Sequence, residues 1–112
     1  MAGISIQALS RRLQDPEVFT LLDVRKLQAL QRSGGKGLPG AQWLDPARWL
    51  DWKDAVPEDR PVVVYCAYGM EISQALTTAL CVMGREAVYL TGGYGAWVEA
   101  GLPTEALPMP SS

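Results

Sequence analysis

Apolar and polar residues follow one another along the chain in two periods, one typical of buried strands and the other of amphipathic helices. Strands are predicted at three short apolar runs rich in β-branched residues, VFTLLDV (18–24), VVVYC (62–66) and EAVYL (86–90), and at the shorter QWL (42–44). Helical patterns separate these runs. The alternation predicts an α/β fold, a parallel sheet with helices on both faces.

The helical segments carry capping residues or apolar faces. They are predicted over residues 5–13, 26–33, the segment after Asp45-Pro46, 71–84 and a short segment around Trp97. Ser5 and Asp45 are suited to cap helix N-termini, and Gly84 is suited to end the helix that begins near residue 71. These caps define where each helix begins or ends.

Two of these helices are predicted to bury particular side chains. On 71–84 the core-facing residues are predicted to be Ile72, Ala75, Leu76, Ala79, Leu80 and Met83, with Ser73, Gln74, Thr77, Thr78 and Cys81 on the opposite, polar face. Trp49 and Leu50 are predicted to face the core from the helix after Asp45.

The organisation is that of one domain. The glycine-rich segment GGKGLPGA (34–41) predicts a loop, and a single domain is predicted over residues 1–105. The proline-rich end, residues 106–112, predicts a flexible tail.

Composition narrows the classes of function. The net charge of -2 and the lack of a Lys/Arg stripe argue against nucleic acid as a partner. No apolar run is long enough to cross a membrane and no basic leader precedes an apolar run, so we expect a protein that is neither inserted nor exported. Two cysteines, too few for a disulfide framework, suit the reducing cytoplasm.

Histidine is absent from the sequence. This excludes Cys-His and Ser-His-Asp catalysis and removes the commonest metal ligand, and no CxxC spacing offers a zinc site. We therefore expect neither a metal nor another cofactor. A nucleophile in this chain has to be activated by local dipoles and hydrogen bonds.

Cys66 is the candidate nucleophile. It ends a predicted buried strand and stands in the loop before a helix, where free backbone N–H groups and the positive end of the helix dipole stabilise a thiolate. Gly69 suits a loop that needs a positive φ to turn its N–H groups inward. The alternative is that Cys66 is only a small buried hydrophobe. Cys81 is expected to lie too far along the helix to pair with it.

The order of motifs resembles a family. FTLLDVR, GLPGAQWL, VVVYC, CAYGME and LTGGYGAWVEAGLP follow one another between residues 4 and 103 as in single-domain rhodanese-like proteins, and the last motif is the most specific. The resemblance implies an enzyme, a sulfurtransferase, in which Cys66 carries a persulfide between a small sulfur donor such as thiosulfate and a thiol or cyanide acceptor. A protein sulfur acceptor is a further candidate partner.

The loop after the cysteine is the expected substrate-binding site, and it departs from the family pattern. Its expected residues are Ala67, Tyr68, Gly69, Met70, Glu71 and Ile72. Glu71 stands where many rhodanese-like loops carry a cation, and Gly37 where the family often has histidine. Glu71 either complements the helix dipole from solvent or faces the pocket, where it would disfavour a dianionic donor. Tyr68 either lines the mouth or packs.

Other polar residues and two rival functions complete the picture. Asp23 and Arg25 are expected to form a structural ion pair or a cap, and the tryptophans to lie in the core or at its rim. A cysteine-based phosphatase or arsenate reductase needs an arginine clamp, yet no Arg or Lys occurs between Cys66 and Met83. A non-catalytic rhodanese-like binding module remains the alternative: Glu71 favours it, and the retained Cys66 argues against it.

Overall fold

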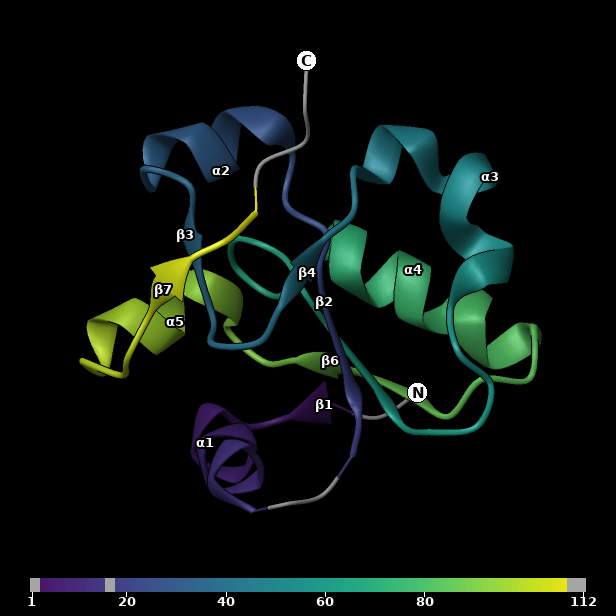
Figure 1. Cartoon of the computed structure of the whole chain (residues 1–112), viewed down its shortest axis with the longest axis horizontal. Helices are drawn as coiled ribbons and strands as arrows, with labels where there is room; N and C mark the ends of the chain where they lie inside the picture. The colour runs from purple at the N-terminus through teal and green to yellow at the C-terminus, as the bar shows by residue number, and fades with distance from the viewer. Residues whose placement is uncertain (1–2, 16–17, 109–112) are drawn as a thin grey trace.

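The computed structural model describes residues 3–15 and 18–108 and confirms the α/β fold (Figure 1). Its strands are β1 (Gly3–Ile4), β2 (Thr20–Asp23), β3 (Lys36–Gly37), β4 (Gln42–Trp43), β5 (Val62–Tyr65), β6 (Ala87–Leu90) and β7 (Glu105–Ala106). Its helices are α1 (Ile6–Gln14), α2 (Leu27–Arg32), α3 (Trp49–Trp52), α4 (Glu71–Val82) and α5 (Gly93–Glu99), with 3-10 turns η1 (Pro46–Arg48) and η2 (Lys53–Ala55). Within the described residues, no helix is both long and apolar enough to span a bilayer.

A parallel sheet of order β1-β6-β5-β2-β4 forms the middle layer. Neighbouring residues of a strand point to opposite faces, so two separate clusters form on the two sides of the sheet. One cluster contains Leu9, Leu21, Leu30, Val63, Tyr65 and Trp97, and the other contains Leu22, Val24, Val62, Val64, Cys66 and Leu80. Helices α1, α2 and α5 cover the first face, and α3 and α4 cover the second (Figure 1).

The ends of β2 and β5 are level, and this places the functional loops together. Asp23 is paired in register with Tyr65, and the Val24 N–H donates to the Tyr65 carbonyl at 2.9 Å. The segments that follow the two strands therefore leave the sheet side by side at its carboxyl edge. Ligands of open α/β sheets bind at this edge.

The predicted helix caps are confirmed. Ser5 Oγ accepts a hydrogen bond from the Ala8 N–H at 3.1 Å, and Asp45 Oδ1 accepts one from the Ala47 N–H at 2.9 Å. Gly84, with φ of 93°, follows the end of α4. Local sequence therefore accounts for these boundaries.

The prediction that Leu50 faces the core is wrong, because its side chain is 77% exposed. Helix α3 is a single turn, and Trp49 and Trp52 occupy its inward side with their rings edge to face at 4.9 Å. Leu50 directly follows Trp49 and is turned about 100° away from that side.

The predicted tail is wrong for its first two residues. Ala106 belongs to β7, which pairs antiparallel with β3, and Leu107 is buried in the core. Strand β3 itself, Lys36–Gly37, lies inside the segment predicted to be only a loop. Both errors have one cause: this pairing joins segments far apart in the sequence, which local patterns do not predict. Residues 109–112 lie outside the described part of the chain.

Candidate active site

The loop from Cys66 to Met70 connects the end of β5 to the start of α4 and borders a cavity of about 530 Å³. Cys66 is 6% exposed, whereas the rim residues Tyr68 and Met70 are 71% and 64% exposed. Gly69 has φ of 68°, which confirms the predicted positive φ. Of the predicted loop residues, all but Gly69 line this cavity. Their role in binding substrate stays a prediction.

Hydrogen bonds around Cys66 favour its thiolate. Burial acts to raise the pKa of this thiol, but hydrogen bonds from the Ser73 hydroxyl and from the backbone N–H groups of Ser73, Tyr68 and Met70 outweigh it, so the pKa is lowered. The Cys66 Sγ to Ser73 Oγ distance is 3.2 Å. The neutral thiol donates to this oxygen, and on ionisation the serine hydroxyl can turn and donate to the thiolate. The direction of the pKa shift matches the sequence prediction.

The predicted inner face of α4 is confirmed in part: Ile72, Leu76 and Leu80 pack in the core. It is wrong for Ala75, which is exposed, and for Ser73 and Thr77, which are fully buried, and Ser73 was missed for this reason. The helix is rotated toward its hydroxyl-bearing side, which brings Ser73 to the cysteine. The rotation leaves Thr77 Oγ1 buried without a hydrogen-bond partner in the described structure. A pattern that assigns Ser and Thr to solvent cannot detect such a face.

The N-terminus of α5 is hydrogen-bonded to the loop that begins at Cys66. The N–H groups of Tyr94 and Gly95 donate to the carbonyls of Cys66 and Ala67 at 2.9 and 2.8 Å. Gly93 has φ of 60°, and a Cβ on it would overlap the Cys66 carbonyl oxygen. The glycines of LTGGYG therefore allow the helix to approach the loop closely.

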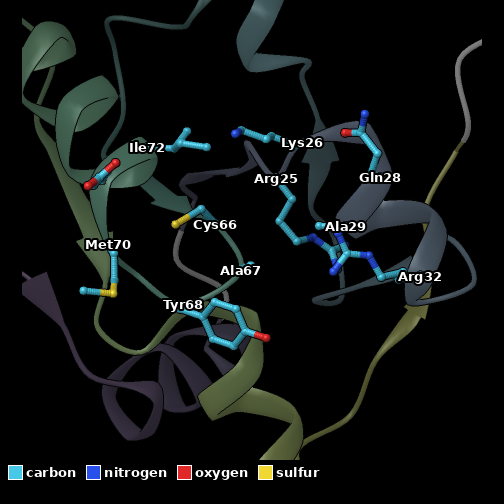
Figure 2. Close-up of a pocket in the computed structure, with 11 residues that line it drawn as sticks. Arg25, Lys26, Gln28, Ala29, Arg32, Cys66, Ala67, Tyr68, Met70 and Ile72 are labelled. Carbon is cyan, nitrogen blue, oxygen red and sulfur yellow. The ribbon is translucent and has the colours of Figure 1, made fainter.

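Helix α2 and the segment before it form the facing wall of the cavity (Figure 2). This wall carries Arg25, Lys26, Gln28, Ala29 and Arg32. Sequence reasoning missed these residues as site residues, because they follow a different strand. The available signal was that parallel strand ends meet at one edge, so the residues after Asp23 lie opposite those after Tyr65.

Among the three cations of this wall, Arg25 forms an ion pair, and its partner is Asp23. Its Nη2 lies 2.6 Å from Asp23 Oδ2, which confirms the expected ion pair, and its guanidinium lies 4.1 Å from the centre of the Tyr94 ring. Burial acts to lower the pKa of Arg25, but the hydrogen bond and charge of Asp23 raise it overall. Arg25 is therefore a structural residue, and Asp23 balances its charge.

Lys26, Arg32 and Glu71 are the exposed charges of the cavity. Among the described residues, none of the three has a side-chain hydrogen bond or an ion pair. Glu71 lies in the first turn of α4, so it combines the two alternatives: it is exposed at a helix N-terminus and it also lines the cavity. In Figure 2 the Lys26 side chain points from its wall toward Ile72.

Gly37 has no room for the histidine that the family often places there. A Cβ on Gly37 would lie 2.7 Å from Tyr65 Oη and about as close to Leu107. Tyr65 Oη in turn donates to Asp23 Oδ2 at 2.7 Å and accepts from the Leu38 N–H at 3.1 Å. In the present chain, the hydrogen-bonded Tyr65 hydroxyl and the Leu107 side chain fill the space next to Gly37.

Within the residues that the structure describes, no group of three or more His, Cys, Asp or Glu side chains is arranged to hold a metal ion. Cys66 and Cys81 are both free thiols, buried and exposed respectively. Independence from metals stays a prediction.

Comparison with known proteins agrees with the geometry. A family model described as "Rhodanese-like domain" matches residues 5–100. A thiosulfate sulfurtransferase GlpE of Actinobacillus succinogenes is 34% identical over 80% of this chain and 78% of its own length. A sulfurtransferase of Allochromatium vinosum is 33% identical over 92% of this chain and 94% of its own. These relatives support a role of the sulfurtransferase type.

A solved structure gives the same fold. A rhodanese-related protein from Thermoplasma volcanium superposes with a TM-score of 0.81 at 23% identity, covering 94% of this chain and 98% of its own. The strand order, the cysteine loop and the sequence match agree, and the chain belongs to the rhodanese-like domain family.

Proposed function

We propose that this chain transfers sulfane sulfur through a persulfide on Cys66. The observation that carries the proposal is the position of this thiol, at the edge of an open cavity and 3.2 Å from Ser73 Oγ, with hydrogen-bond donors around its sulfur that lower its pKa. The thiolate is the reactive form of cysteine, so this arrangement supports a nucleophile. We place the activity in the cytoplasm, which suits two unpaired cysteines.

In the loading step the Cys66 thiolate attacks the outer sulfur of a donor such as thiosulfate. A bond forms between Sγ and that sulfur, the sulfur–sulfur bond of thiosulfate breaks, and sulfite leaves with the electron pair. The negative charge moves to the terminal sulfur of the persulfide. We expect the backbone N–H groups that surround Sγ to stabilise this charge as well.

In the unloading step a thiolate or cyanide attacks the terminal sulfur. The bond from that sulfur to Sγ breaks, and Cys66 leaves as the thiolate that began the cycle. No oxidant or metal is needed for either step. Hydrogen bonds that lower the Cys66 pKa also make it a better leaving group here.

The test is cyanolysis: thiosulfate and cyanide are supplied and thiocyanate is measured. We expect activity in the native chain and in Cys81→Ser, and none in Cys66→Ser. Activity that survives in Cys66→Ser would refute the assignment. If neither thiosulfate nor inorganic polysulfide supports thiocyanate formation, the non-catalytic binding module becomes the better hypothesis.

A further inference from the structure

We propose that the sulfur acceptor is a zwitterionic, peptide-sized thiol, with carboxylates bound by Lys26 and Arg32 and an ammonium group bound by Glu71. This inference rests on the proposed function and names the substrate class of the same cavity. It is carried by the size of the cavity and by the opposite charges of its two walls.

The cavity is larger than a thiosulfate or cyanide ion requires. Its volume of about 530 Å³ lies in the range of clefts that hold organic ligands of several hundred daltons. A second hollow of about 260 Å³ continues beyond Tyr68 to Tyr94 and Gly95, and it shares Arg32 with the first. Tyr68 and Arg32 line both hollows, and we call the two hollows together the groove.

The two walls of the cavity differ in charge. Lys26 and Arg32 lie on the α2 wall without partners among the described residues, while the third cation, Arg25, is balanced by Asp23. Glu71 is the acidic residue of the cavity lining, and it comes from α4. A dianion such as thiosulfate is attracted by one wall and repelled by the other. A zwitterion that spans the groove is attracted by both.

The cavity lining also offers apolar surface. Ala29 from α2 and Ile72 from α4 line the cavity, and Tyr68 and Met70 are largely exposed at its rim. The methylene and amide groups of a peptide match this surface, with its terminal charges at the two walls. Cys66 lies in the same lining, so a thiol in the middle of the peptide can reach its persulfide.

The chemistry of the step is balanced. The thiol of the acceptor loses its proton to solvent, and its thiolate attacks the outer sulfur of the Cys66 persulfide. The bond between that sulfur and Sγ breaks, Sγ becomes a thiolate, and the acceptor leaves as its own persulfide. One sulfur atom and no net electrons are transferred.

The experiment follows the second half-reaction alone, in single turnover. Protein loaded with sulfur from thiosulfate and then freed of donor is mixed with glutathione, glutathione monoethyl ester or 2-mercaptoethanol, and loss of the persulfide is timed. Glutathione is the zwitterionic probe, the ester lacks one carboxylate, and 2-mercaptoethanol is neutral and small. Lys26→Gln, Arg32→Gln and Glu71→Gln are compared with Arg11→Gln and Glu99→Gln, whose exposed charges lie outside the cavity lining.

The readout is the ratio of the glutathione rate constant to the 2-mercaptoethanol rate constant. We expect each cavity variant to lower this ratio about two- to fivefold, as exposed charge pairs do, and the two controls to leave it unchanged. The preference of the native chain for glutathione over its ester should shrink in at least one α2 variant. Loading from thiosulfate should become about two- to fivefold faster in Glu71→Gln, the opposite sign.

Two failures are distinguishable. Ratios that match the controls in all three variants, with normal transfer to 2-mercaptoethanol, would overturn the substrate class and leave the sulfurtransferase proposal intact. A native chain that acquires no persulfide from thiosulfate or inorganic polysulfide would overturn both.

Discussion

Removal of the Ser73 hydroxyl should make Cys66 less reactive at neutral pH. A hydrogen bond to a charged group contributes about 1.5 to 3 kcal/mol, so Ser73→Ala should lower the thiolate fraction at pH 7 about 10- to 100-fold. A thiolate of higher pKa is intrinsically more nucleophilic, with a Brønsted slope of about 0.4–0.5, which recovers about half of the loss on a logarithmic scale. The net expectation is a reaction rate about three- to tenfold lower.

The assay is the rate of iodoacetamide alkylation of Cys66 across pH, in a Cys81→Ser background because Cys81 is exposed. Since the hydrogen bond lowers the Cys66 pKa, its loss should raise that pKa and move the profile to higher pH. Above both pKa values the order should reverse, with Ser73→Ala reacting faster.

Thr77→Val is the matched control for Ser73→Ala. Thr77 is buried one turn further along α4, and its hydroxyl has no partner within the described structure. Its replacement by an isosteric apolar side chain should leave the profile unchanged and the stability equal or higher by about 1 kcal/mol. An alkylation profile of Ser73→Ala that superposes on that of the native chain would refute the reasoning.

Three further predictions concern stability and independence from metal ions. Gly93→Ala should lower the free energy of unfolding in urea by about 1–3 kcal/mol more than Gly34→Ala, because both have positive φ but only Gly93 meets backbone atoms of the cysteine loop; equal losses would contradict this. Leu107→Ala should cost about 2–5 kcal/mol and Leu50→Ala less than about 0.5 kcal/mol, since only Leu107 is buried; a tolerated Leu107→Ala would restore the tail hypothesis. EDTA should change neither the melting temperature nor the cyanolysis rate, and a shift of several degrees would reveal a missed metal site.

The sequence predicted those parts of the fold and site that depend on local pattern. The apolar run that ends at Cys66 predicted a buried strand, and Gly69 predicted a turn of positive φ; both are confirmed. The Ser5 and Asp45 caps were predictable for the same reason, because each acts on backbone groups within three residues.

Features that depend on tertiary packing were not predictable in this way. The rotation of α4 that buries Ser73 is set by the sheet and the loop, and hydrophobic periodicity favoured the neighbouring face. The pairing of β7 with β3 accompanies the burial of Leu107, and it joins Glu105–Ala106 to Lys36–Gly37, which are far apart in the sequence. Lys26 and Arg32 reach the cavity only because β2 lies beside β5 in the sheet.

The charge of the site also depends on this packing. Between Cys66 and the end of α4 the sequence contains Glu71 but no Lys or Arg. The structure adds two exposed cations on the facing wall, Lys26 at the N-cap of α2 and Arg32 at its end, so the cavity carries both signs of charge. The residues of such a site therefore have to be predicted from the segments that follow neighbouring parallel strands, and not only from the motif that contains the cysteine.

The central claim, that Cys66 carries the transferred sulfur, is tested most directly by mass spectrometry. The Cys81→Ser protein is incubated with thiosulfate, freed of donor, and measured intact and as peptides before and after addition of cyanide. The account predicts a gain of one sulfur atom on the peptide that contains Cys66, and its loss when cyanide is added. A protein that gains no sulfur from thiosulfate or inorganic polysulfide, or gains it on a peptide without Cys66, would contradict the account.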